Sequence, residues 1–84
     1  MTENAVLVYS KKNCFKCEMA KKLLMNNDVP FVTLDVEEDE SAMDYLKEIG
    51  VFALPLVTYS GTQSYGFNPD ALHYISDLYK EKQA

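Results

Sequence analysis

The 84-residue chain contains no arginine, and its formal net charge is −5 at pH 7. Proteins that bind nucleic acid through the phosphate backbone depend on clustered lysine and arginine side chains. Five of the eight lysines lie between residues 11 and 22, but they form only a small basic patch on an acidic protein. We therefore expect no nucleic-acid partner.

Long hydrophobic runs are also missing. No apolar stretch approaches the roughly 18 to 20 residues that a membrane-spanning helix requires. Residues 1–9 lack the basic segment, apolar stretch and small-residue cleavage site of a signal peptide. We expect a cytoplasmic monomer with no membrane partner, and the length predicts a single domain spanning residues 1–84.

Cysteine is scarce, since the chain has only Cys14 and Cys17. One bridge over so short a loop could not hold a disulfide-dependent scaffold together, and in a reducing compartment such a pair is more often catalytic or metal-binding. A CxxC pair by itself is equally compatible with half of a zinc site or with a metallochaperone loop. The position of the pair in the fold therefore decides its interpretation.

The apolar pattern predicts four strands and three helices. Short branched or aromatic runs predict strands at residues 5–9, 31–36, 56–59 and 63–65, the last two joined by a turn at residues 60–62. Helical spacing predicts helices near residues 14–26, 42–49 and 69–79. Asn13 is the expected N-cap of the first helix, and Asn68 followed by Pro69 is typical of the start of the last.

The resulting order, β-α-β-α-β-β-α, predicts an α/β protein with the thioredoxin-like fold, in which helices flank one mixed four-stranded sheet. The first β-to-α turn of such a sheet lies at the carboxyl end of a strand, where open α/β proteins bind their ligands. Both cysteines lie in that turn.

This placement favours redox chemistry. Unpaired backbone N–H groups and the macrodipole at a helix N-terminus stabilise an anion, so they lower the pKa of a thiol placed there. Lys11, Lys12 and Lys16 add positive charge nearby. We expect Cys14 to be the nucleophilic thiolate and Cys17, which is more shielded, to be the thiol that resolves the mixed disulfide.

Pro55 lies directly before a predicted strand, where proline is disfavoured unless it forms a turn or a cis bond. A cis proline beside the cysteines would present the backbone of Leu54 to an extended substrate. We therefore expect both residues to belong to the substrate groove.

Three motifs resemble those of glutaredoxins: the runs from Val8 to Cys17, from Ala53 to Val57 and from Tyr65 to Asp70. The chain resembles glutaredoxins over nearly its whole length, and most of all the NrdH-type redoxins. These glutaredoxin-shaped proteins take electrons from thioredoxin reductase and pass them to class Ib ribonucleotide reductase. The resemblance implies a dithiol–disulfide oxidoreductase that needs no metal or tightly bound cofactor.

The resemblance also implies residue roles. Cys14 would be the nucleophile, Cys17 the resolving thiol and Pro55 the cis proline, with the electrons carried by a redox-active Cys14–Cys17 disulfide. The substrate-binding residues expected around the pair are Lys11, Phe15, Lys16, Leu54, Pro55, Gly66, Phe67 and Asp70.

Residues 65–70 bear on the electron source. Glutathione-using glutaredoxins typically carry two glycines and an aspartate pair here, whose carboxylate and backbone N–H hold the γ-glutamyl end. This chain has Asn68 and Pro69 at the aspartate positions, and proline has no N–H to donate. NrdH-type proteins commonly read WSGFxPD, and residues 66–70 match the second half of that pattern. Thioredoxin reductase is therefore the expected reductant, with ribonucleotide reductase or other protein disulfides as substrates.

Two alternatives stay open. Lys11 favours a glutathione-dependent glutaredoxin, because glutaredoxins use a basic residue at this place for a glutathione carboxylate. A metal or iron–sulfur binding module is the other alternative. Tetrahedral zinc takes four ligands, whereas this chain offers two cysteines and His73, which lies far away in the last predicted helix.

Overall fold

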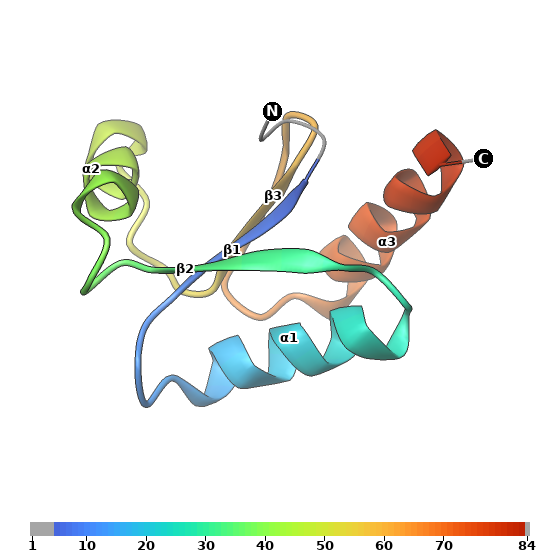
Figure 1. Cartoon of the computed structure of the whole chain (residues 1–84), viewed down its shortest axis with the longest axis horizontal. Coiled ribbons are helices and arrows are strands. Elements are labelled where there is room, and N and C mark those ends of the chain that lie inside the picture. Colours follow the sequence, from blue (N-terminus) through green and yellow to red (C-terminus); the bar gives the residue numbers. More distant parts are fainter. Residues whose placement is uncertain (1–4, 84) are drawn as a thin grey trace.

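The computed structural model describes residues 5–83, which form four strands and three helices in the predicted order (Figure 1). Strand β1 pairs in parallel with β2 and antiparallel with β3, and β3 pairs antiparallel with β4. The strand order is β2-β1-β3-β4, which confirms the predicted mixed four-stranded sheet. The elements are β1 (Val6–Ser10), α1 (Phe15–Asn26), β2 (Phe31–Asp35), α2 (Glu40–Ile49), β3 (Leu56–Tyr59), β4 (Thr62–Tyr65) and α3 (Pro69–Gln83).

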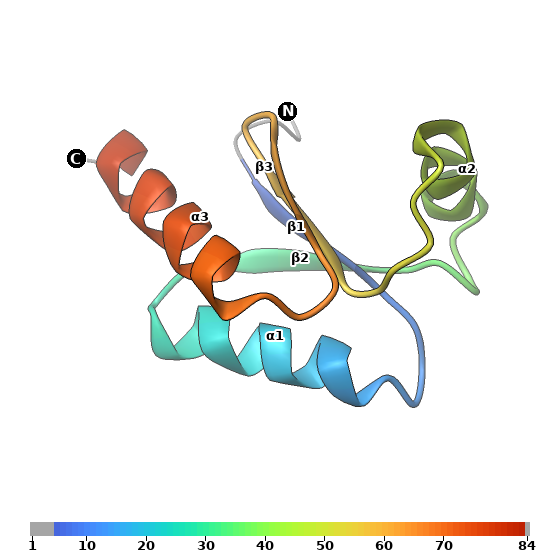
Figure 2. The same cartoon turned by 180° about the vertical axis from the view of Figure 1, so that it is seen from behind.

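Helices cover both faces of the sheet, as predicted. Helices α1 and α3 pack together on one face, and α2 lies on the other (Figures 1 and 2). Because successive side chains of a strand point to opposite faces, β1 contributes Val6 and Val8 to the core under α1 and α3, and Tyr9 to the core under α2. The protein therefore has two small cores with the sheet between them.

Local backbone signals explain where several elements end. Asp39 caps α2 by accepting the N–H of Ala42 at 3.2 Å, and Gly50 ends this helix with a φ of 72°. The turn between β3 and β4 comprises Ser60 and Gly61, whose φ values of 49° and 84° are those of a type I′ turn. The predicted three-residue turn was therefore one residue too long, because Thr62 already belongs to β4.

The bounds of the first two strands also differ from the prediction by one residue. Strand β1 starts at Val6 and extends to Ser10, which pairs with Asp35. Strand β2 ends at Asp35, because the side chain and the carbonyl group of Asp35 start a turn by accepting the N–H groups of Glu37 and Glu38.

Two buried serines differ in their hydrogen bonding. Ser76 on α3 donates to the carbonyl of Leu72 at 2.8 Å and accepts from the amide of Asn27 at 3.1 Å. Ser64 on β4 is 1% exposed, and its hydroxyl has no partner among the residues that the structure describes. A buried hydroxyl without a hydrogen bond destabilises the folded state, because its interaction with water is lost without replacement.

We therefore expect Ser64→Ala to raise the free energy of unfolding by about 1 kcal/mol, measured by denaturant unfolding. Ser76→Ala is the matched control. It removes a serine of the same burial whose hydroxyl is bonded, so it is expected to lower the free energy of unfolding by about 1 kcal/mol. Equal destabilisation by both changes would show that the Ser64 hydroxyl has a favourable partner after all.

Candidate active site

Strand pairing brings three distant segments to one end of the sheet. Tyr9 pairs with Leu56, and Leu56 pairs with Tyr65. These three residues form one row across the sheet. Strand β1 ends one residue after this row, β3 begins in it and β4 ends in it. The cysteine turn, the segment leading to Leu56 and the segment that follows Tyr65 therefore share this end of the sheet (Figures 1 and 2).

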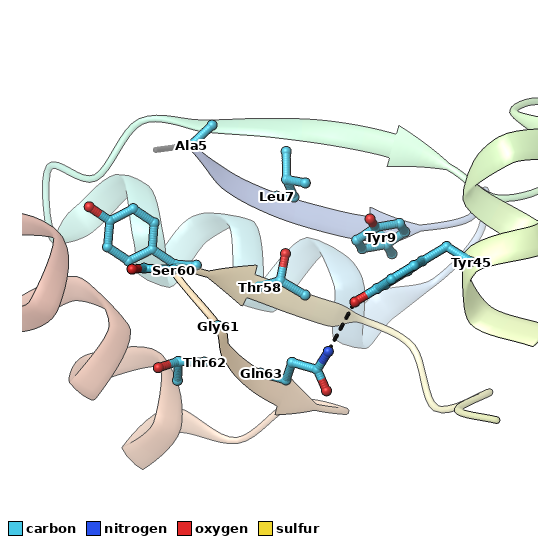
Figure 3. Close-up of a pocket in the computed structure, with 10 residues that line it drawn as sticks. Ala5, Leu7, Tyr9, Tyr45, Thr58, Ser60, Gly61, Thr62 and Gln63 are labelled. Atoms are coloured by element: carbon cyan, nitrogen blue, oxygen red, sulfur yellow. Dashed lines mark hydrogen bonds between the residues drawn. The ribbon is translucent and has the colours of Figure 1, made fainter. Parts of the chain in front are cut away.

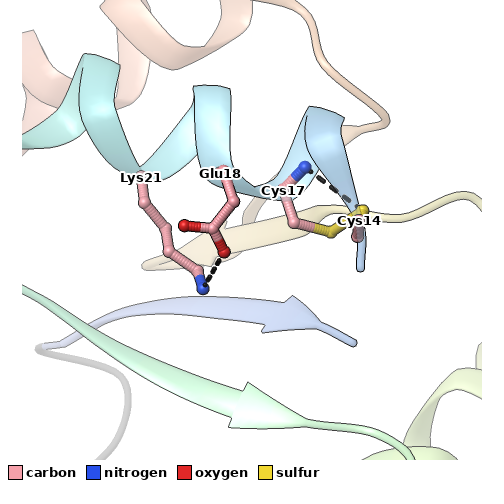
Figure 4. Close-up of polar contacts among 4 residues, drawn as sticks. All are labelled: Cys14, Cys17, Glu18 and Lys21. Carbon is pink, nitrogen blue, oxygen red and sulfur yellow. Dashed lines mark hydrogen bonds and ion pairs between the residues drawn. A yellow bond between two sulfur atoms is a disulfide. The ribbon is translucent and has the colours of Figure 1, made fainter. Parts of the chain in front are cut away.

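Cys14 and Cys17 form a disulfide at the start of α1, with their Cα atoms 5.2 Å apart (Figure 4). Cys14 is the N-cap of the helix, and its Sγ accepts the backbone N–H of Cys17 at 3.2 Å. Cys17 is 0% exposed, whereas Cys14 is only partly buried. An incoming sulfur atom can therefore approach Cys14 more readily than Cys17.

The predicted N-cap, Asn13, was wrong by one residue. Asn13 has a φ of 58°, in the left-handed region that asparagine tolerates better than most residues. This turn of the backbone puts Cys14 in extended conformation, with a φ of −108°, and its sulfur takes the capping position that the amide of Asn13 was expected to fill. Cys14 consequently precedes the first helical turn instead of lying within it.

Leu54 and Pro55 lie beside the end of β1, because the next residue, Leu56, pairs with Tyr9. The Leu54–Pro55 peptide bond is cis, as predicted. Pro55 is buried, and Leu54 is partly buried against the core under α2. The structure thus places both predicted groove residues at the end of the sheet that carries the cysteines.

Ion pairs neutralise part of the positive charge near the cysteines. Lys12 pairs with Glu38 at 2.7 Å, and Lys21 pairs with Glu18 at 2.9 Å (Figure 4 shows the second pair). Lys11 and Lys16 are exposed, and neither forms an ion pair within residues 5–83. The local charge therefore depends on fewer lysines than the sequence alone indicates.

The segment after β4 starts the last helix. Gly66 has a φ of 68°, and the side-chain Oδ1 of Asn68 accepts the N–H of Ala71 at 3.2 Å, which confirms the predicted cap. Phe67 is partly buried against the core under α1 and α3, whereas Asp70 is exposed in the first turn of α3. The side chain of Asn68 is thus already engaged by its own helix.

Tyr9 belongs to the core, since it is 7% exposed and stacks on Tyr45 with ring centroids 5.4 Å apart. Burial raises the pKa of Tyr9, and the neighbouring Tyr45 and Asp39 raise it further.

Tyr45 accepts a hydrogen bond from Gln63 at 3.0 Å beside a cavity of about 340 Å³ on this face of the sheet (Figure 3). The sequence pattern did not indicate this cavity, because its walls come from four separate elements and the β3–β4 turn.

Residues 5–83 hold no group of three or more histidine, cysteine, aspartate or glutamate side chains able to bind a metal ion. His73 is exposed on α3, and its Nδ1 lies 3.2 Å from the side-chain amide of Asn27. Within the same range, no helix is long and apolar enough to span a membrane.

Comparisons with known proteins agree with this geometry. The family model for glutaredoxin matches residues 6–63. The glutaredoxin-like protein NrdH of Lactococcus lactis subsp. cremoris (strain MG1363) is 34% identical over 67 residues, which are 80% of this chain and 93% of that protein. The N-acetyl-S-hydroxy-L-cysteine reductase of Bacillus subtilis (strain 168) is 33% identical over 72 residues, which are 83% of this chain and 77% of that protein.

The fold is also that of a solved redoxin. The structure of the glutaredoxin-like NrdH-redoxin from Escherichia coli superposes with a TM-score of 0.81 at 24% identity, covering 84% of this chain and 93% of that one. This likeness confirms the predicted thioredoxin-like fold.

The position of Cys14 at the helix N-terminus predicts a lowered thiol pKa in the reduced protein, because the N–H of Cys17 and the macrodipole stabilise the thiolate. The pH dependence of Cys14 alkylation is expected to give a pKa below the value of a free thiol, about 8.5. The Lys11→Gln and Lys16→Gln variants separate the contribution of the side-chain charges and are expected to raise this pKa only slightly. A pKa at or above about 8.5 in the unaltered protein would contradict the role of the helix terminus.

Proposed function

Because the chain belongs to the glutaredoxin family of thiol–disulfide oxidoreductases, we propose that it is a dithiol electron donor that thioredoxin reductase reduces. Its substrates are protein disulfides, with ribonucleotide reductase as the first candidate. The observation that carries the choice of electron source is the start of α3. Asn68 uses its side chain to cap the helix, and Pro69 has no N–H to donate.

Binding of the γ-glutamyl end of glutathione at this place would need a carboxylate and a backbone N–H. The amide of Asn68 bears no charge, and its Oδ1 is occupied by the N–H of Ala71. Pro69 opens α3, where its ring fits the helix but removes the donor. These two residues therefore argue for a protein reductase and against glutathione.

The cysteine pair supports a two-step exchange. The Cys14 thiolate attacks one sulfur of the substrate disulfide, so that a mixed disulfide forms and the other substrate sulfur leaves as a thiolate. Cys17 then loses its proton and attacks the Sγ of Cys14, which releases the second substrate thiol and closes the Cys14–Cys17 disulfide. Two electrons pass to the substrate, and two electrons from NADPH return through the reductase.

The relatives support the same assignment. The chain matches the NrdH protein of Lactococcus lactis over 93% of that protein's length. The related NrdH-redoxin of Escherichia coli is described as having a thioredoxin-like activity profile. We carry the reductase and the substrate over from this group as part of the proposal.

A glutathione-dependent activity is the second candidate, and the exposed Lys11 is the observation in its favour. It offers a positive charge to a glutathione carboxylate, but it does not replace the two groups that are missing at Asn68 and Pro69.

We further propose that residues 1–84 form a single domain that acts as a monomer. A dithiol that an NADPH-dependent reductase restores works in a reducing compartment, so we assign the protein to the cytoplasm.

The electron source is tested by supplying the oxidised protein with NADPH and either thioredoxin reductase or glutathione plus glutathione reductase. Reduction of a protein disulfide is expected with the first system and not with the second, because Asn68 and Pro69 lack the groups that hold glutathione. NADPH consumption measures the turnover. The double variant Asn68→Asp, Pro69→Asp is the informative control, since it restores a carboxylate and an N–H and is expected to add activity with glutathione. Turnover of the unaltered protein with the glutathione system, and not with thioredoxin reductase, would contradict the proposal.

The roles of the two cysteines are tested by single substitutions. Cys14→Ser is expected to abolish disulfide reduction, because Cys17 is buried and cannot replace the nucleophile. Cys17→Ser is expected to stop after the first step and to accumulate a mixed disulfide between Cys14 and the substrate, detected by mass spectrometry and released by dithiothreitol. Accumulation of the mixed disulfide on Cys17 of the Cys14→Ser variant would reverse the assignment.

A further inference from the structure

We propose that Phe15 and Phe52 form an apolar rim beside Cys14 that selects substrate segments carrying an apolar side chain next to the disulfide cysteine. This inference rests on the proposed reduction of protein disulfides and names the kind of segment that the site accepts. Its occupant is an extended segment of the partner protein, with acidic residues near the apolar one.

The exposure of the two rings is the first argument. Phe15 is 76% exposed and Phe52 is 67% exposed, the two highest values among the large hydrophobic side chains of residues 5–83. Neither ring belongs to one of the two cores or packs against one. Exposed apolar side chains gathered at one place mark surfaces that bind a partner.

The position of the rings is the second argument. Phe15 directly follows Cys14 as the first residue of α1, on one face of the sheet. Phe52 lies in the segment that connects α2, on the other face, to Leu56 beside Tyr9. The start of α1 and the segment that leads to β3 lie at the same end of the sheet, as Figures 1 and 2 show from opposite sides.

Phe52 and Ala53 are exposed between two neighbours that are anchored on the protein. Val51 and Leu54 are partly buried and pack against the core under α2. The segment is therefore docked on the protein, yet Phe52 does not join the core. Packing of the core therefore does not account for a phenylalanine at this position.

Charge complementarity identifies the occupant. Lys11 and Lys16 are exposed beside Cys14, and within residues 5–83 neither is engaged in an ion pair. A partner segment with carboxylates on either side of its disulfide would pair with these lysines while its apolar side chain covered the rings. Glutathione has carboxylates but no apolar side chain, so it would use only half of this surface.

The test uses the reduced protein in stoichiometric amount, which makes it independent of the electron source. Two synthetic disulfide peptides with the same aspartates differ only beside the first cysteine, where one has leucine and the other serine. The rate of disulfide reduction is expected to be about 5- to 10-fold higher for the leucine peptide. Phe15→Ser and Phe52→Ser are each expected to reduce this ratio toward one.

Two controls separate the rim from the reaction itself. Met25→Ser removes a side chain that is 57% exposed near the far end of α1, and it is expected to leave the ratio unchanged. Reduction of dithiodiglycolate, a small charged disulfide, is expected to proceed at the same rate in the unaltered protein and in the Phe52→Ser variant, because Phe52 lies outside the loop between the two cysteines.

The outcomes distinguish the two proposals. Equal rates for both peptides in the unaltered protein, or an unchanged ratio in both phenylalanine variants, would overturn the rim while dithiodiglycolate reduction still supported the oxidoreductase. A reduced protein that acts on neither peptide nor dithiodiglycolate would overturn the proposed function, and the rim with it.

Discussion

The backbone pairing of Tyr9 with Leu56, and of Leu56 with Tyr65, is the constraint on which the candidate active site depends. These residues lie far apart in the sequence, and the row that they form sets the end of the sheet. Everything assigned to the site comes from the chain just beyond this row. A shift of one residue in either pairing would turn alternate side chains to the opposite face and separate the cysteines from the segments that surround them.

The three helices begin in the same way, with a side chain that accepts the N–H three residues later. Asp39 and Asn68 do so with oxygen atoms, whereas Cys14 does so with sulfur. At the first helix, the group that satisfies an otherwise unpaired N–H is therefore also the atom that reacts. The same contact between the N–H of Cys17 and the sulfur of Cys14 caps the helix and stabilises the thiolate. A substitution that alters this contact therefore changes both helix stability and thiol reactivity.

Asn68 shows how a structural requirement can restrict chemistry. Because its side chain caps α3 and the next residue is proline, the start of this helix is stable and offers little to an anionic tripeptide. In the proposed function, the exposed rings of Phe15 and Phe52 and the exposed Lys11 and Lys16 instead contact a larger partner with both apolar and acidic residues.

The sequence by itself determined the order of the elements, the placement of the cysteines at a helix start and the cap at Asn68, because these depend on local spacing and on the chemistry of neighbouring residues. It placed the first cap one residue too early, since the left-handed backbone of Asn13 has no pattern of its own. Only the tertiary structure decided that Glu38 neutralises Lys12, that Tyr45 bonds Gln63 and that Phe52 stays exposed. Each of these results depends on contacts between segments remote in the chain, which periodicity and composition cannot specify.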